Sequence, residues 1–143
     1  MRIRAVESSD AAEWLRMRAL LWPADGHAGE IEEYFRTNGG PVFVAEASPG
    51  HLVGFIELGL RAYAEGCDSS PVPFIEGWYV DPEFRRAGVG RDLVRAAEQW
   101  ARDRGFTEIA SDVELENDVS IASHRALGYE ETSRLVCFRR TIT

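Results

Sequence analysis

The sequence predicts an α+β protein in which one mixed β-sheet is flanked by four helices. Its length of 143 residues suits a single domain. Hydrophobic residues make up 45% and charged residues 28%, as in a soluble globular protein and unlike a disordered chain. Segments with strand and helix periodicity follow in the order β-α-α-β-β-β-α-β-α-β-β, which favours one sheet covered by helices. We therefore expect residues 1–143 to form one domain.

The N-terminal part begins with a strand followed by two helices. Polar and apolar residues alternate over Arg2–Val6, as in a half-buried strand. Ser8-Ser9-Asp10 offers N-cap side chains for a first helix, which Pro23 ends. A second helix is predicted over Gly29–Phe35, where Asn38-Gly39-Gly40 stops it.

The middle of the chain is rich in β-forming residues. Strands are predicted over Pro41–Ala47 and Leu52–Ala64, and Ser48-Pro49-Gly50-His51 between them is typical of a hairpin turn. A further strand is predicted over Phe74–Val80, and Asp81-Pro82 closes it.

The C-terminal part contains the strongest helix pattern. Gly88–Arg104 places its apolar residues on one face, as an amphipathic helix does. It precedes a strand over Thr107–Asp112 and a helix over Asn117–Leu127. Two last strands are predicted over Tyr129–Ser133 and Leu135–Ile142.

The charge balance excludes several functions. The net charge is -8, which opposes general nucleic-acid binding because that needs a basic surface to neutralise phosphates. All sixteen basic residues are arginine, so no lysine nucleophile or Schiff base is available. No stretch approaches the roughly 20 apolar residues that cross a bilayer, and the N-terminus lacks a signal-peptide core. We expect a cytoplasmic protein without a membrane or nucleic-acid partner.

The two cysteines do not indicate a metal site. Cys67 and Cys137 lie in separate contexts without a CxxC pair or another metal-ligand spacing. No metal cofactor is expected.

The segment from Val80 to Arg91 has the pattern of an anion-binding loop. A strand leads into Arg85-Arg86-Ala87-Gly88-Val89-Gly90, and the amphipathic helix begins there. Glycines let the backbone approach a ligand, the first N–H groups of a helix lack intrahelical partners, and the helix dipole favours negative charge. Arginine side chains around the loop add cationic donors. The whole pattern favours a phosphate ligand over a plain tight turn.

This segment resembles the acyl-CoA pyrophosphate loop of the GNAT N-acetyltransferase superfamily, whose Arg/Gln-x-x-Gly-x-Gly/Ala pattern falls on Arg85, Gly88 and Gly90. The resemblance covers essentially the whole chain and implies a mostly antiparallel GNAT-like sheet with acetyl-CoA as co-substrate. Asn117, which is also a plain N-cap candidate, matches a position that contacts the pantetheine arm. The implied cofactor-binding residues are Trp78, Tyr79, Val80, Arg85, Arg86, Ala87, Gly88, Val89, Gly90, Arg91 and Asn117.

Four further segments narrow the resemblance to the small dimeric aminoglycoside 6'-N-acetyltransferases. These are Leu20–Pro23, Ser70–Val80, Ala110–Asp112 and His124–Tyr129. The resemblance implies an aminoglycoside substrate, a role in antibiotic resistance, and a homodimer. Its substrate-binding positions fall on Trp22, His27, Tyr63, Glu76 and Asp112. The chain departs from the family at Ser133, where the family has an acid.

Acyl transfer needs a base for the attacking amine and an acid for the leaving thiolate. Glu76 alternates with apolar residues in a predicted central strand, where an unpaired buried carboxylate would be costly, so a role as general base explains it better. His124 occupies the slot where many GNAT enzymes place a tyrosine acid, although a packed helix residue is an equally simple reading. Direct attack in a ternary complex is expected.

Two other functions stay open on the sequence. A GNAT enzyme acting on another polyamine or on a protein N-terminus would carry the same loop. A catalytically silent acyl-CoA-sensing module would also carry it, although such a sensor has no need of Glu76 and Asp112.

Overall fold

Five strands form one open sheet whose spatial order follows the chain, β1-β2-β3-β4-β5. The computed structural model describes all 143 residues. Its strands are β1 (Arg2–Ala5), β2 (Val42–Ser48), β3 (His51–Arg61), β4 (Val72–Val80) and β5 (Ala110–Ser111). The first four strands pair antiparallel, and only β5 runs parallel to its neighbour. The predicted mixed, mostly antiparallel sheet is confirmed.

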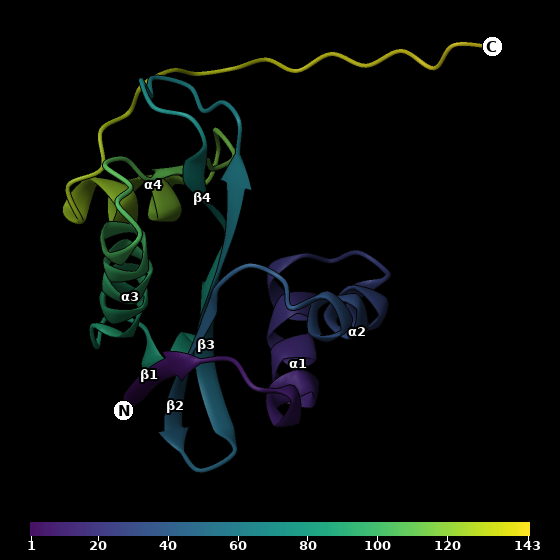
Figure 1. The fold of residues 1–143 in the computed structure, drawn as a ribbon, viewed down its shortest axis with the longest axis vertical. Helices are drawn as coiled ribbons and strands as arrows, with labels where there is room; N and C mark the ends of the chain where they lie inside the picture. The colour runs from purple at the N-terminus through teal and green to yellow at the C-terminus, as the bar shows by residue number, and fades with distance from the viewer.

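Four helices flank this sheet, as predicted for the α+β class. They are α1 (Ala11–Leu21), α2 (His27–Thr37), α3 (Val89–Asp103) and α4 (Asp118–Ala126). Figure 1 shows α1 and α2 on one side of the sheet and α3 and α4 on the other. No helix of the structure is long and apolar enough to cross a membrane.

The sheet buries apolar side chains on both faces, because strand residues alternate between the two sides. On the face of α1 and α2, the core consists of Trp14, Met17, Ile31, Val42, Val44, Leu52, Phe55 and Tyr79. On the face of α3, it consists of Ala45, Val53, Ile56, Leu58, Ile75, Val89, Leu93, Val94 and Ala97. These two layers fix the positions of β3 and β4, which carry the site.

A β-bulge in β4 lies at Glu76. Glu57 of β3 pairs with Gly77, and the next residue, Leu58, pairs with Ile75. Glu76 is therefore the extra residue in the ladder, and the bulge gives its side chain a direction that strict alternation would not. Bulges often lie next to active sites for this reason.

The sheet opens between β4 and β5. Only Phe74 with Ala110 and Ile75 with Ser111 are paired, so residues 76–80 have no strand partner on that edge of β4. Peptide groups on this edge face no neighbouring strand, so a ligand that enters the opening can bind them. We call this opening the β4–β5 split.

The prediction of two C-terminal strands over Tyr129–Ser133 and Leu135–Ile142 is wrong for this chain. These residues form no helix or strand. Thr132 still contacts the loop after β3 through a hydrogen bond to Glu65 O, and the chain beyond it extends away from the body as the yellow end of Figure 1. The strand predicted over Thr107–Asp112 is only Ala110–Ser111. A strand needs a hydrogen-bonding neighbour. In the single chain, β4 is the only neighbour of the segment 107–112, and the segment 129–142 has none.

Candidate active site

The anion-binding loop lies at the N-terminus of α3. Gly88, the N-cap, has a φ of +85°, a left-handed conformation that glycine adopts at little cost. It has no side chain to cap the helix, and the first hydrogen bond runs from Asp92 N to Gly88 O at 3.0 Å. The N–H groups of Val89, Gly90 and Arg91 therefore have no intrahelical partner and can bind phosphate oxygens.

Arginines surround this loop in different ways. Arg85 Nε donates to Val80 O at 2.9 Å and so ties the loop to the end of β4. Arg86 is exposed and has a φ of +63°, unusual for a residue with a side chain. Arg91 packs against Gly88, where an added Cβ would come 2.7 Å from its guanidinium. Ala87 is exposed on the same loop.

Residues 78–80 line the β4–β5 split. Trp78 is half-buried, and its Nε1 donates to Gly90 O at 3.2 Å, which couples β4 to the start of α3. Tyr79 is buried and its hydroxyl donates to Asp81 Oδ1 at 2.9 Å. Only backbone groups of Tyr79 are thus available to a ligand in the split.

His124 and Ser111 meet on the other wall of the split. His124 Nε2 lies 2.8 Å from Ser111 Oγ, and His124 Nδ1 lies 2.7 Å from the Ser120 carbonyl oxygen. A carbonyl can only accept, so Nδ1 carries a proton and, in the neutral ring, the Ser111 hydroxyl donates to Nε2. The imidazole also packs edge-on against Trp78 at 5.2 Å between centroids. The sequence analysis did not identify Ser111 as a site residue.

Asn117 caps α4 as its sequence context suggested. Its Oδ1 accepts from Ser120 N at 3.1 Å, and the residue is exposed.

Glu76 lies over β3, on the face of α1 and α2. Its carboxylate fits above Gly59, where an added Cβ would come 2.9 Å from Oε1. Glu76 is not an unpaired buried carboxylate, because 36% of its side chain is exposed and Arg61 binds it. Arg61 Nε donates to Oε1 at 2.9 Å and Arg61 Nη2 to Oε2 at 2.7 Å. The β-bulge turns this side chain out of the core.

Trp22 lies against Gly77, the residue after Glu76 in β4, and stacks on His27. An added Cβ at Gly77 would clash with the Trp22 ring, so glycine is required for this close approach. The rings of Trp22 and His27 stack with centroids 6.2 Å apart. His27 is buried, with Nε2 2.8 Å from Trp22 O. The structure thus brings Trp22 to the strand position beside Glu76 and stacks His27 on the tryptophan.

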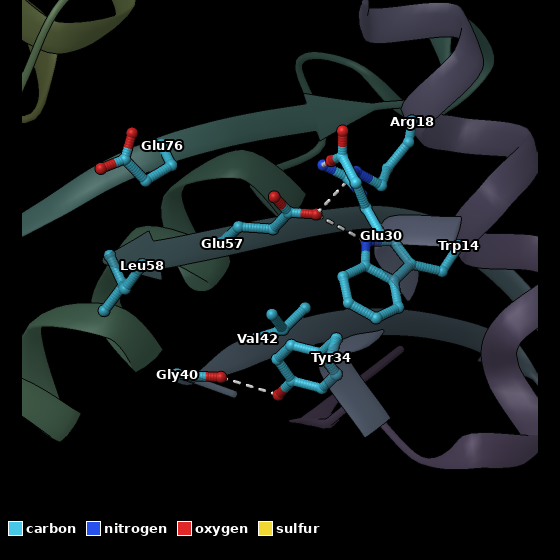
Figure 2. Close-up of a pocket in the computed structure, with 9 residues that line it drawn as sticks. All are labelled: Trp14, Arg18, Glu30, Tyr34, Gly40, Val42, Glu57, Leu58 and Glu76. Atoms are coloured by element: carbon cyan, nitrogen blue, oxygen red, sulfur yellow. Dashed lines mark hydrogen bonds and ion pairs between the residues drawn. The ribbon is translucent and has the colours of Figure 1, made fainter. Parts of the chain in front are cut away.

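A cavity of about 170 Å³ opens beside Glu76, between β3, α1 and α2 (Figure 2). Aromatic side chains and carboxylates dominate its wall, as suits a ligand with sugar rings and ammonium groups. It is lined by Trp14, Arg18, Glu30, Tyr34, Gly40, Val42, Glu57, Leu58 and Glu76.

Glu57 is a half-buried carboxylate in this cavity that the sequence analysis missed. It accepts from Trp14 Nε1 at 2.8 Å, and Arg18 Nε lies 3.1 Å from the same oxygen. Burial raises the pKa of Glu57, an effect that the Arg18 charge and the Trp14 hydrogen bond oppose. Arg18 also binds Glu30 at 2.6 Å. A carboxylate within the apolar run Phe55-Ile56-Glu57-Leu58 is the sequence signal that could have found it.

The remaining predicted positions lie on exposed segments. Tyr63 follows β3, is 67% exposed, and its hydroxyl donates to Glu65 Oε2 at 3.1 Å. Asp112 is exposed directly after β5, and its charge contributes to raising the pKa of Arg61, so the two groups lie near one another. Ser133 is exposed in the C-terminal segment.

Glu76 and the Ser111–His124 pair flank the split from opposite sides. The Ile75–Ser111 pair is the last rung before the split, and Glu76 follows Ile75 directly. Ile75 belongs to the core on the face of α3, whereas Glu76 faces α1 and α2 across Gly59. A proton acceptor on one face and a proton-carrying pair on the other suit transfer of an acyl group between two ligands that meet in the split.

Comparisons with known proteins find relatives of this chain in one enzyme family. The model of the acetyltransferase (GNAT) family matches residues 9–129. An aminoglycoside N(6')-acetyltransferase type 1 of Klebsiella aerogenes is 48% identical, and the match covers 98% of this chain and 96% of that protein. The protein of the same name from Stenotrophomonas maltophilia is 47% identical, with 96% and 91% covered. The solved structure of AAC(6')-Iy with the bisubstrate analogue CoA-S-monomethyl-acetylneamine has a TM-score of 0.90 at 37% identity, covering 99% of this chain and 98% of that one.

Proposed function

The chain belongs to the GNAT acetyltransferase family, and we propose that it transfers an acetyl group from acetyl-CoA to the 6'-amine of an aminoglycoside antibiotic. The observation that carries this proposal is the identity of 48% over nearly the full chain to an aminoglycoside N(6')-acetyltransferase. The cavity beside Glu76, with its aromatic walls and carboxylates, supports a polycationic sugar as the acceptor. The reaction confers resistance, and we place it in the cytoplasm, where acetyl-CoA is available. Residues 1–143 act as one catalytic domain.

The residues present fit acetyl-CoA. The free N–H groups at the start of α3, with Arg85, Arg86 and Arg91 around them, suit its pyrophosphate. The open edge of β4 over residues 78–80 and the side chain of Asn117 suit the pantetheine arm. When bound, acetyl-CoA supplies the acetyl group as a thioester.

Three groups of this chain move or stabilise charge in the proposed reaction. Glu76 accepts a proton from the 6'-ammonium, directly or through water, so that the nitrogen lone pair can attack the carbonyl carbon. Backbone N–H groups near Val80 stabilise the charge that develops on the carbonyl oxygen as the C–S bond breaks. His124 supplies the proton for the leaving thiolate. In this step the ring carries a proton on both nitrogens, so that Nε2–H donates to Ser111 Oγ. The serine hydroxyl gives its own proton to the thiolate and takes the Nε2 proton in its place, which leaves His124 neutral.

Substrate binding is assigned to groups around Glu76. Trp22 and Tyr63 offer aromatic surfaces to the sugar rings, and Asp112 offers a second carboxylate to an ammonium group. His27 acts through Trp22, which it contacts from behind.

A side-by-side turnover assay tests this function against its alternatives. Thiol release from acetyl-CoA is measured with kanamycin, tobramycin, spermidine and a peptide with a free N-terminus. Turnover with both aminoglycosides at least about tenfold faster than with spermidine or peptide is expected, because only the aminoglycosides offer both sugar rings and several ammonium groups. Faster turnover of spermidine or of the peptide would favour another GNAT substrate, and no turnover at all would favour the acyl-CoA-sensing alternative.

We also propose that the protein is a two-fold symmetric homodimer, joined through the C-terminal segment. Leu135, Val136, Phe138 and Ile142 are between 57% and 93% exposed in the single chain. A second copy would give this segment a strand neighbour and bury these side chains.

The dimer predicts a particle of about 32 kDa, twice the chain mass of 16.0 kDa. Light scattering on the full chain and on a variant that ends at Ser133 measures this mass. We expect the truncated variant to be a monomer, because the apolar residues 135–142 are gone. A full-length chain that stays at 16.0 kDa at micromolar concentration contradicts the proposal.

A further inference from the structure

Arg61 occupies both oxygens of the proposed catalytic base. Its guanidinium makes a bidentate pair with Glu76, with N–O distances of 2.9 and 2.7 Å. Bidentate arginine–carboxylate pairs are among the stronger and more directional polar contacts in proteins. The guanidinium carbon also lies 3.5 Å from the centroid of the Phe74 ring, which is itself buried. Two independent contacts therefore hold this side chain on Glu76.

We infer that the Arg61 guanidinium occupies the position on Glu76 that the substrate ammonium group takes. The ammonium group must therefore displace Arg61 from Glu76 before acetyl transfer. This inference rests on the proposed function. A guanidinium and an alkylammonium are both cationic hydrogen-bond donors. The bidentate pair fills the two lone pairs that point outward between the carboxylate oxygens, so an ammonium group reaches that position only by displacing Arg61. Arg61 is thus a specificity-determining residue that sets the affinity for the acceptor amine.

The surroundings of Arg61 allow this exchange. Its side chain is 43% exposed and that of Glu76 is 36% exposed, so the pair can open toward solvent. When the Arg61 guanidinium leaves Glu76, it retains its contact with the face of the Phe74 ring. The nearby Asp112 charge, which adds to the effect of Glu76 in raising the pKa of Arg61, offers a second anion. The exchange therefore leaves no buried unpaired charge.

The expected effect follows from competition. If Glu76 is free in only a fraction of the molecules, the apparent affinity for the drug falls by that fraction. A partly exposed pair is modest in strength, so we expect that removing Arg61 lowers the drug KM by about three- to tenfold, with kcat changed by less than about twofold. Most substitutions near a site raise KM, so the sign of this change is diagnostic.

The test compares Arg61→Gln and Arg61→Lys with the wild type. Lysine keeps the charge but cannot make the bidentate pair, so the KM for tobramycin should rise in the order glutamine variant, lysine variant, wild type. Arg102→Gln on α3 is the matched control, because it removes the same charge from an exposed arginine that pairs with Glu98 on the opposite side of the sheet. Its KM should change by less than about twofold.

Calorimetric drug binding supplies a readout that does not depend on turnover. Arg61→Gln should tighten tobramycin binding in the wild-type background and have no effect in a Glu76→Gln background, since the competition acts only through Glu76. A KM or Kd that stays the same or rises in Arg61→Gln overturns the inference, while wild-type turnover of tobramycin keeps the proposed function intact. Absence of wild-type turnover overturns the proposed function, and the binding data then still decide the role of Arg61.

Discussion

Replacing Glu76 with glutamine is expected to lower kcat for acetylation of tobramycin by roughly 10²–10⁴, the usual contribution of a general base. Glutamine keeps the size of the side chain at the β-bulge but cannot accept the proton of the 6'-ammonium. The binding of acetyl-CoA should not change, because Glu76 lies on the opposite side of the sheet from α3. Steady-state kinetics and calorimetry with acetyl-CoA measure the two quantities.

The control for this variant is Glu33→Gln. Glu33 is an exposed carboxylate on α2 that also pairs with an arginine, Arg36, so this change removes the same charge and the same kind of pair. Its kcat should stay within about twofold of the wild type, as for most surface substitutions. If Glu76→Gln raises only the drug KM and leaves kcat intact, Glu76 is a binding anion and the base lies elsewhere.

Gly88→Val is expected to weaken acetyl-CoA binding at least about 100-fold. One or two hydrogen bonds to a charged phosphate, worth about 1.5–3 kcal/mol each, are lost when the loop can no longer approach the ligand. At a φ of +85° valine is strained, and its side chain would also displace the Arg91 guanidinium. Calorimetry with acetyl-CoA measures the loss.

Gly105→Val separates this effect from backbone strain alone. Gly105 has a φ of +80° just beyond the other end of α3, and an added Cβ there has no neighbour within 4 Å. Both variants should lose stability by about 1–3 kcal/mol in thermal unfolding. Only Gly88→Val should lose affinity for acetyl-CoA. Equal cofactor affinity in the two variants contradicts the assignment of this loop to the pyrophosphate.

The sequence predicted the anion-binding loop well because local rules determine it. A strand, a glycine at a left-handed position and an amphipathic helix can all be recognised from short-range patterns. The structure places Gly88 at the N-cap and leaves the first N–H groups of α3 without partners, as that pattern indicates.

Longer-range features could not be predicted in the same way. The bulge at Glu76 depends on the register between β3 and β4, and the Arg61 pair joins residues fifteen positions apart. Alternation alone could not show that Glu76 is the extra residue of a bulge or that it pairs with Arg61. The prediction of the last two strands was wrong because a β pattern indicates only a preference for strand pairing. The pattern does not say whether a pairing partner exists in the same chain.

The central claim is that this chain acetylates an aminoglycoside at its 6'-nitrogen, and the identity of the acetylated nitrogen tests it most directly. Tobramycin and a 6'-hydroxyl aminoglycoside are each incubated with acetyl-CoA, and the products are assigned by nuclear magnetic resonance and mass spectrometry. We predict one acetyl group, on the 6'-nitrogen of tobramycin, and none on the 6'-hydroxyl compound, which should still bind. Acetylation of tobramycin at another amine, or of the 6'-hydroxyl compound at any amine, would contradict the claim.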